Sequence, residues 1–183
     1  MATWTHPTLG EFEYDEIGWI GEISLPGMRH FYRDAPADFD WAVTETTFES
    51  ESTDKFPSEQ MIAVAIDIFA NNERLISDGV RILFDDIAGT GPNSGMWWHS
   101  ALAKVNEKLA GESMKLDDAT DLFEILDGPS IFVQESGCDF DRACGIIEFH
   151  TPIDEEHGVG WLTDGNKILG TGYRNDTCVT EGL

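Results

Sequence analysis

Residues 146–173 read IIEFHTPIDEEHGVGWLTDGNKILGTGY, and this stretch decides the fold. It predicts three short strands, joined by the acidic bend Asp154-Glu155-Glu156-His157-Gly158 and by a turn at Asp164-Gly165. An Asp-Gly pair between two apolar runs favours a hairpin, because a type I′ turn needs positive φ at both central residues. Further glycines in the stretch are typical of twisted or closely packed strands. The C-terminal part of the chain is therefore expected to form antiparallel sheet.

The N-terminal and central parts carry both strand and helix patterns. Residues 9–25 alternate loosely and predict two strands with a turn near Asp15-Glu16, residues 29–40 predict a loop, and residues 41–49 predict a third strand. Pro57 opens the longest helical pattern, which continues to about residue 87 with its apolar residues on one stripe. Asn71-Asn72 and Gly79 weaken the middle of this helix, so a break into two helices is an open alternative.

The remaining patterns complete the expected architecture. Shorter helical patterns end near residue 109 and cover about 117–126, and strands follow at 131–134 and 145–149. We therefore predict an α+β fold: a mainly antiparallel sheet of short strands with two or three helices packed on one face. The length of 183 residues predicts a single domain, 1–183, with N-terminal strands in 9–49, a helical segment in 57–126 and C-terminal strands in 130–173.

The charge balance is the strongest guide to function. The chain has 35 Asp and Glu against 11 Lys and Arg, a formal net charge of −24. A field of this sign repels nucleic acid and anionic membranes and attracts cations or basic partners. The same charge also suits solubility in an acid-shifted proteome, and the sequence leaves both explanations open.

Targeting features and cysteines point to one compartment. The N-terminal residues show no secretion signal, no run of about 18 apolar residues occurs, and the three cysteines form no CxxC pair. These features predict a cytoplasmic protein with no membrane partner.

The bend Asp154–His157 is the most suggestive group for chemistry. Carboxylates and an imidazole can bind a divalent cation or act as a general acid or base, with Asp139 and Asp141 as further candidates. However, four consecutive residues of a turn point in different directions and rarely converge on one ion. The alternative is a bend that shapes the hairpin or contacts a partner, with His157 bonded to a neighbouring group. The chain also lacks a phosphate-binding loop, a calcium loop, a zinc motif and a nucleophile elbow, so we expect no catalytic residue, no metal and no cofactor.

Two further features suit a binding surface. Trp97 and Trp98 are adjacent and splay by about 100° on a helix, so one of them is a candidate interface residue, with an aromatic cap over a helix end as the alternative. Acidic residues also gather in clusters, which are Glu11-Glu13-Asp15-Glu16, Asp38-Asp40, Glu49-Glu51 and Asp154-Glu155-Glu156.

The layout as a whole resembles a set of uncharacterised bacterial domains. These domains open with a His-Pro-x-x-Gly-like segment and an early pair of aromatic strands, continue with a central helix, and close on an apolar-Asp-x-Glu-His-Gly hairpin. The matching pieces here are His6–Gly10, Trp19, the helix from Pro57 and Asp154–Gly160, with Ile153 where relatives tend to have Trp. Some members look like immunity proteins, which neutralise a co-encoded toxin. The resemblance implies an intracellular binding role and transfers no catalytic residue.

These observations lead to one main hypothesis and two alternatives. The main hypothesis is a non-enzymatic acidic binding protein, most concretely an immunity-type inhibitor that occludes a basic toxin or effector domain. The first alternative is a DNA-mimic or counter-defence protein of a phage or mobile element, and the second is a metal-dependent hydrolase built on the Asp154–His157 bend. The residues expected to contact the partner are Asp154, Glu155, Glu156, His157, Glu11, Glu13, Asp15, Glu16, Trp97 and Trp98.

Overall fold

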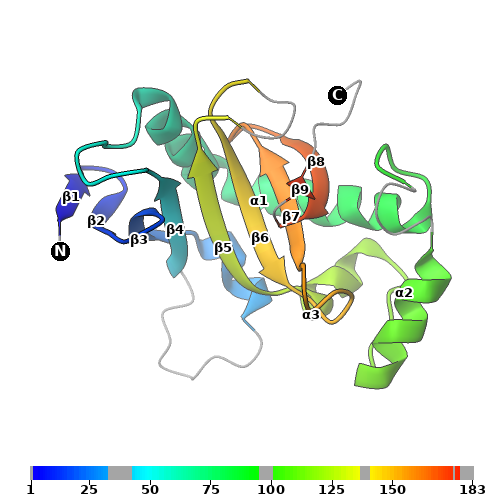
Figure 1. Ribbon diagram of the computed structural model, residues 1–183. Coiled ribbons are helices and arrows are strands. Elements are labelled where there is room, and N and C mark those ends of the chain that lie inside the picture. The colour runs from blue at the N-terminus through cyan, green and yellow to red at the C-terminus, as the bar shows by residue number, and fades with distance from the viewer. Residues whose placement is uncertain (1, 33–42, 95–100, 137–140, 175, 178–183) are drawn as a thin grey trace.

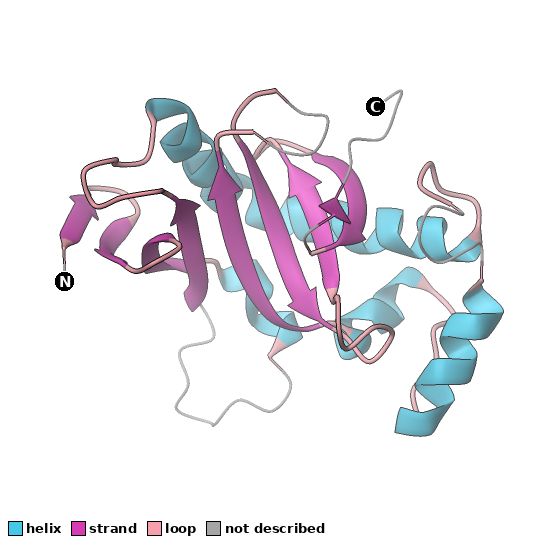
Figure 2. Cartoon of the chain, in the orientation of Figure 1, coloured by secondary structure: helices cyan, strands magenta, loops and turns pink. Residues whose placement is uncertain are grey.

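The computed structural model describes residues 2–32, 43–94, 101–136, 141–174 and 176–177 (Figure 1). These residues form a large, mostly antiparallel sheet together with helices, so the α+β prediction is confirmed (Figure 2). Strand order in the sheet follows chain order from β1 to β9. The strands are β1 (Thr3–His6), β2 (Gly10–Tyr14), β3 (Gly18–Ser24), β4 (Val43–Glu49), β5 (Asp127–Gln134), β6 (Cys144–His150), β7 (Val159–Thr163), β8 (Ile168–Tyr173) and β9 (Asp176–Thr177).

One parallel pair interrupts this antiparallel order. β4 and β5 run parallel, and a parallel pair needs a long crossover rather than a tight hairpin. The crossover holds α1 (Glu59–Ala88), α2 (Leu102–Leu109), η2 (Ala110–Glu112), η3 (Ala119–Asp121) and α3 (Leu122–Ile125), and a further short helix, η1 (Pro26–Phe31), precedes β4. The helical segment of the chain therefore separates the two halves of the sheet in sequence while the sheet itself stays continuous.

The longest helix has clear sequence reasons for its two ends. At the N-terminus Ser58 Oγ accepts a hydrogen bond from the Met61 N–H at 3.2 Å. At the C-terminus Gly89 adopts the left-handed conformation, with φ of 83°, that glycine accepts most readily. Between these caps α1 is one helix of 30 residues, so the alternative of two helices is not realised.

Tertiary contacts support the weak middle of α1. Asn71 Nδ2 donates to the carbonyl oxygen of Gly165, in the turn between β7 and β8, at 3.1 Å. Gly79 has no side chain, and the buried ring of Trp161 on β7 lies where a Cβ would stand. Residues that lower helix propensity thus make the contacts that dock the helix on the sheet.

α1 packs against one face of the sheet and closes the main core. Ile68 lies against Gly145 of β6, and Asp86 accepts a hydrogen bond from the Thr171 hydroxyl of β8 at 2.5 Å. Figure 1 places α1 behind β5 to β8, whereas α2 lies beyond the edge of the sheet. The prediction that two or three helices pack on one face is therefore not confirmed.

Several local predictions need correction. The sequence did not predict β1, whose four residues pair with β2, or the short helix η1. The third helix is a 3-10 turn followed by one short α-helical turn, and Gly128-Pro129 lie inside β5 at a register shift rather than only ending that helix. In the described part of the chain, no helix is both long and apolar enough to cross a bilayer.

Candidate functional site

A line of glutamates crosses the sheet on the face turned away from α1. Glu22 of β3 stands directly opposite Glu45 of β4, and Ser130 of β5 stands between Glu45 and Glu148 of β6. Glu11 of β2 extends the line by one strand, because the register of β2 with β3 continues to it. We call Glu11, Glu22, Glu45 and Glu148 the acidic row. The first three are exposed, and Glu148 is half-buried.

A second line of side chains runs beside the acidic row on the same face. The pairing of β3 to β7 aligns five residues, one from each strand, which we call the apolar row after its four apolar members: Ile20, Thr47, Phe132, Ile146 and Leu162. The first three are half-buried, and the last two are buried. Side chains two residues apart on a strand share a face, so β3, β4 and β6 each give one member to each row, whereas β5 places Ser130 on the line of the acidic row. An anionic strip thus borders an apolar one.

The two rows meet at an open hollow near the N-terminal edge of the sheet. This hollow has a volume of about 570 Å³, and its acidic lining residues are Glu11, Glu13, Asp15 and Glu22. Asp15 Oδ1 also accepts the Ile17 N–H at 2.9 Å, which fixes the turn between β2 and β3. Three of the predicted contact residues, Glu11, Glu13 and Asp15, are therefore brought together, and Glu16 is exposed in the same turn.

Charges on this face act on nearby titratable groups. Burial raises the pKa of Glu148, against the opposing effects of the Arg174 charge and a hydrogen bond with Ser130. Burial also raises the pKa of the Tyr32 hydroxyl, and the charges of Asp127, Glu22 and Glu45 add to that increase, whereas a hydrogen bond with Thr44 opposes it. The field of the acidic row therefore reaches a neighbouring tyrosine.

The acidic row weakens the fold that carries it. Like charges directly opposite each other on neighbouring strands destabilise a sheet, by roughly 0.2–1 kcal/mol per pair. In the described part of the chain, the ion pairs involve other carboxylates, and Glu11, Glu22 and Glu45 have no basic partner within ion-pair distance. Among the described residues, no basic side chain therefore relieves their mutual repulsion.

The bend Asp154–His157 forms a separate, self-satisfied turn between β6 and β7. Asp154 Oδ1 accepts the backbone N–H of His157 at 3.0 Å and lies 3.0 Å from its ring Nδ1. Partial burial alone would raise the pKa of Asp154, but these hydrogen bonds and the charges of His157 and Lys108 hold that pKa below its ordinary value. The ring of His157 also packs on Tyr173 at a centroid distance of 4.9 Å. This geometry matches the predicted alternative in which His157 is bonded to a neighbouring carboxylate.

Backbone contacts fix the bend to its surroundings. Gly158 has a φ of 63°, and a Cβ there would come within 2.6 Å of the Phe149 carbonyl oxygen. Arg174 Nε donates to the His157 carbonyl oxygen at 3.2 Å, and Lys108 Nζ donates to the Ile153 carbonyl oxygen at 2.9 Å. The bend is therefore held in place by Arg174, directly after β8, and by Lys108 of α2.

The other predicted contact residues fall in three places. Glu155 lines an open hollow of about 360 Å³ together with Glu112, Asp127 and His150, and Glu156 is exposed. Trp97 and Trp98 lie outside the described residues, as do Asp38 and Asp40. Glu49 is exposed on β4, and Glu51 is ion-paired with Lys55.

The structure offers no metal centre in the residues it describes. Within them, no three His, Cys, Asp or Glu side chains gather as a metal ion would require. Asp139 lies outside this set, and Asp141 is exposed. The described residues thus give the hydrolase alternative no ligand set.

Sequence reasoning missed Glu22, Glu45 and Glu148 as candidate contact residues. The signal for them was strand alternation: in β4, VTETTFE, buried Thr44, Thr46 and Phe48 alternate with more exposed residues. Alternation assigns each glutamate to the outer face, whereas only the sheet register aligns them into one row.

The chain matches no protein-family model, no curated protein and no solved structure. The resemblance to the bacterial hairpin domains therefore stays a prediction.

Proposed function

We propose that this protein is a non-enzymatic acidic binding protein, most concretely an immunity-type inhibitor in the cytoplasm that occludes a basic toxin or effector domain. The observation that carries the proposal is the acidic row, which lies beside the apolar row on one face of the sheet. The proposal includes the expectation that the helices stay on the opposite face, so that this face is free for the partner.

The two rows would contribute to binding in different ways. Carboxylates on an exposed face raise the association rate of a cationic partner and orient it, and this effect weakens as ionic strength rises. Apolar side chains such as Ile20 and Phe132 gain free energy when a partner removes them from water. A basic protein surface with apolar side chains among its cations is complementary to both rows.

The repulsion within the acidic row supports the same proposal. Glu22 and Glu45 destabilise the free protein, and a cationic partner would convert that repulsion into attraction. Functional surfaces commonly retain such residues at the expense of stability. The apolar row also favours a toxin-like partner over the target of a DNA mimic, because a phosphate backbone presents charges without an apolar strip beside them.

Affinity capture from the native host, with a matched pair of variants, tests the proposal. The first variant neutralises the hollow and row with Glu11→Gln, Glu22→Gln and Glu45→Gln, and the control removes three exposed carboxylates elsewhere with Glu107→Gln, Glu124→Gln and Glu135→Gln. Both variants change the net charge by the same amount. We expect the wild type and the control to capture one basic protein, and the row variant to capture at least tenfold less of it.

The association rate of the captured partner provides the second readout. We expect this rate to fall steeply with salt for the wild type and the control, and much less for the row variant. Equal capture by the two variants would show that net charge rather than the row drives binding. Recovery of no protein partner, or of a partner with an acidic surface, would contradict the proposal.

A further inference from the structure

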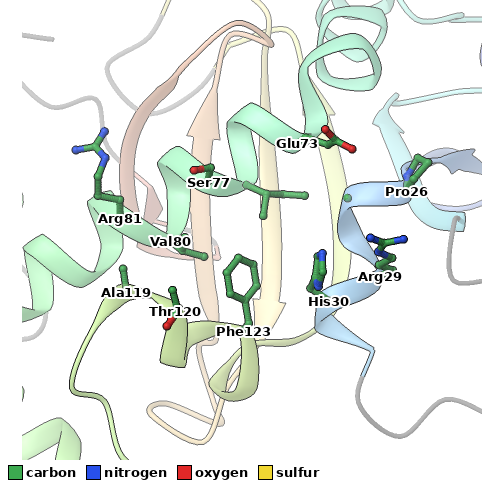
Figure 3. Close-up of a pocket in the computed structure, with 12 residues that line it drawn as sticks. Pro26, Arg29, His30, Glu73, Ser77, Val80, Arg81, Ala119, Thr120 and Phe123 are labelled. Carbon is green, nitrogen blue, oxygen red and sulfur yellow. The ribbon is translucent and has the colours of Figure 1, made fainter.

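A pocket of about 480 Å³ lies among η1, α1 and the η3–α3 segment (Figure 3). Its volume falls within the range of about 300–1,000 Å³ that is typical of small-molecule sites. Ile76 and Val80 of α1 are buried in its wall, and Phe123 of α3 is half-buried. Figure 3 shows the Phe123 ring standing between the α1 side and the η1 side of the pocket. The pocket therefore offers an apolar surface that includes one aromatic ring.

The wall formed by η1 is fixed by close packing on α1. The Gly27 N–H donates to Asn72 Oδ1 at 3.0 Å, and a Cβ on Gly27 would lie only 2.6 Å from that oxygen and 2.8 Å from Ile76 Cδ1. On the far side of η1, the His30 ring lies 5.4 Å from the Phe123 ring, centroid to centroid. A wall held at both ends makes a preformed site, which lowers the entropic penalty of ligand binding.

The charge of the lining reverses that of the chain. Arg29 and His30 line the pocket from η1, Arg81 lines it from α1, and Glu73 is the one carboxylate among its described lining residues. The chain as a whole carries 35 acidic residues against 11 Lys and Arg. A local excess of basic groups is therefore a specific property of this pocket rather than a consequence of composition.

The basic residues differ in how far they are already neutralised. Arg81 lies 3.5 Å from Asp78 Oδ1 and 3.9 Å from Asp85 Oδ2, and its guanidinium extends away from the centre of the pocket (Figure 3). Arg29 has no ion pair within the described part of the chain, and it lies next to His30 on η1. The cationic end of the pocket is thus the η1 side.

We propose that this pocket binds a small organic anion with an apolar body, such as an aromatic carboxylate. The carboxylate would bind at Arg29 and His30, and the apolar body would lie against Ile76, Val80 and Phe123. The charge complementarity of the η1 wall selects an anion, and the apolar wall selects a ligand that is not fully polar. This inference is independent of the acidic row, which belongs to the opposite face of the sheet.

Calorimetric titration with two probes of the same shape and opposite charge tests the proposal. 4-Phenylbutyrate and 4-phenylbutylamine share their apolar body and differ in the sign of the terminal group. Because the net charge of −24 favours the amine over the butyrate for the chain as a whole, a preference for the butyrate would indicate a local cationic site. We expect the wild type to bind 4-phenylbutyrate at least tenfold more tightly than 4-phenylbutylamine.

Variants locate the site and separate its two parts. Arg29→Gln combined with His30→Gln should weaken butyrate binding at least fivefold, whereas Lys104→Gln, which removes one exposed charge from α2, should leave it unchanged. Ser77→Phe, a bulky substitution at an exposed lining position, should abolish butyrate binding. Circular dichroism of each variant serves as the control for folding.

Three results would overturn the proposal. These are equal or tighter binding of the amine, no binding of the butyrate at millimolar concentration, and butyrate binding that survives both the Arg29→Gln/His30→Gln and Ser77→Phe changes. None of them bears on capture of a basic partner by the acidic row, so this proposal and the proposed function fail independently.

Discussion

Neutralising Glu22 should stabilise the free protein, which is the opposite of the usual effect of a substitution. Glu22 is exposed in the middle of the acidic row, with Glu45 directly opposite it and Glu11 on its other side. Glu22→Gln keeps the size of the side chain and its hydrogen-bonding capacity but removes the charge. The change therefore isolates electrostatic repulsion from packing.

The expected magnitude follows from the geometry of neighbouring strands. Coulomb's law gives about 0.6 kcal/mol for two unit charges roughly 7 Å apart in water. Cross-strand pairs in a sheet typically contribute roughly 0.2–1 kcal/mol, and like charges directly opposite are destabilising, so the figure from Coulomb's law lies within the usual range for such pairs. With one neighbour on each side, Glu22→Gln should raise the free energy of unfolding by about 0.5–1 kcal/mol at low salt. In about 1 M salt, where the screening length falls to about 3 Å, the gain should nearly vanish.

Urea unfolding at low and high NaCl concentration measures both quantities. Glu135→Gln, at an exposed position just after β5, is the control for the general benefit of removing one negative charge from this chain. Glu22→Gln should stabilise the protein more than this control at low salt and equally at high salt. A gain equal to that of the control, or one that persists undiminished in high salt, would refute repulsion within the acidic row.

Three further predictions address Glu148, the Asp154–His157 bend and the docking of α1. Burial raises the pKa of Glu148, so the fold favours the protonated form, and the stability that this residue contributes is lost as pH rises through that pKa. Glu148→Gln should therefore stabilise the protein at neutral pH but not near pH 4, and urea unfolding at both pH values would reveal the difference. His157→Ala should raise the pKa of Asp154, because in the wild type the hydrogen bonds and charge of His157 contribute to outweighing the effect of burial. The stability that Asp154 supplies above its unfolded pKa should then be lost at a higher pH. Carboxyl NMR titration measures the pKa, and an unchanged value would contradict the prediction. Gly79→Ala should destabilise the protein by about 1–3 kcal/mol, because the new Cβ would overlap the Trp161 ring. This cost exceeds the roughly 1 kcal/mol by which alanine favours a helix over glycine. Ser77→Ala, at an exposed position of the same helix, should be nearly neutral, and thermal unfolding measures both variants.

Local rules in the sequence were sufficient for many of the elements. The Asp164-Gly165 pair predicted a turn, and a turn does join β7 and β8 there, but only Gly165 has a positive φ, 89°, so it is not the type I′ turn with positive φ at both central residues. Alternation predicted β2, β3 and β4, because each of these strands has one buried face and one face that is exposed or half-buried. Where a prediction depended only on propensity, tertiary contacts overrode it, as in the unbroken course of α1 past Asn71 and Gly79.

The acidic row could not be predicted in the same way. It depends on the parallel pairing of β4 with β5, which places Glu45 beside Ser130 although the whole helical segment separates them in sequence. Sequence patterns assign a residue to a face, but the register between strands of distant sequence is decided by packing of the complete core. The basic pocket is likewise formed where η1, α1 and α3 meet, and residues 29–40 read only as a loop.

Ionic strength links the charge of this protein to its function. In a proteome adapted to molar salt, the repulsion between Glu22 and Glu45 would be screened, and the acidic row would carry no penalty that requires a functional explanation. At about 0.15 M salt the screening length is about 8 Å, so the penalty is present and a cationic partner would relieve it. The acidic row therefore supports a binding role only where the protein works at moderate salt, and the salt at which Glu22→Gln ceases to stabilise the protein marks the boundary between the two explanations. A partner that bound equally well above and below this boundary would be held by the apolar row, with the carboxylates serving solubility.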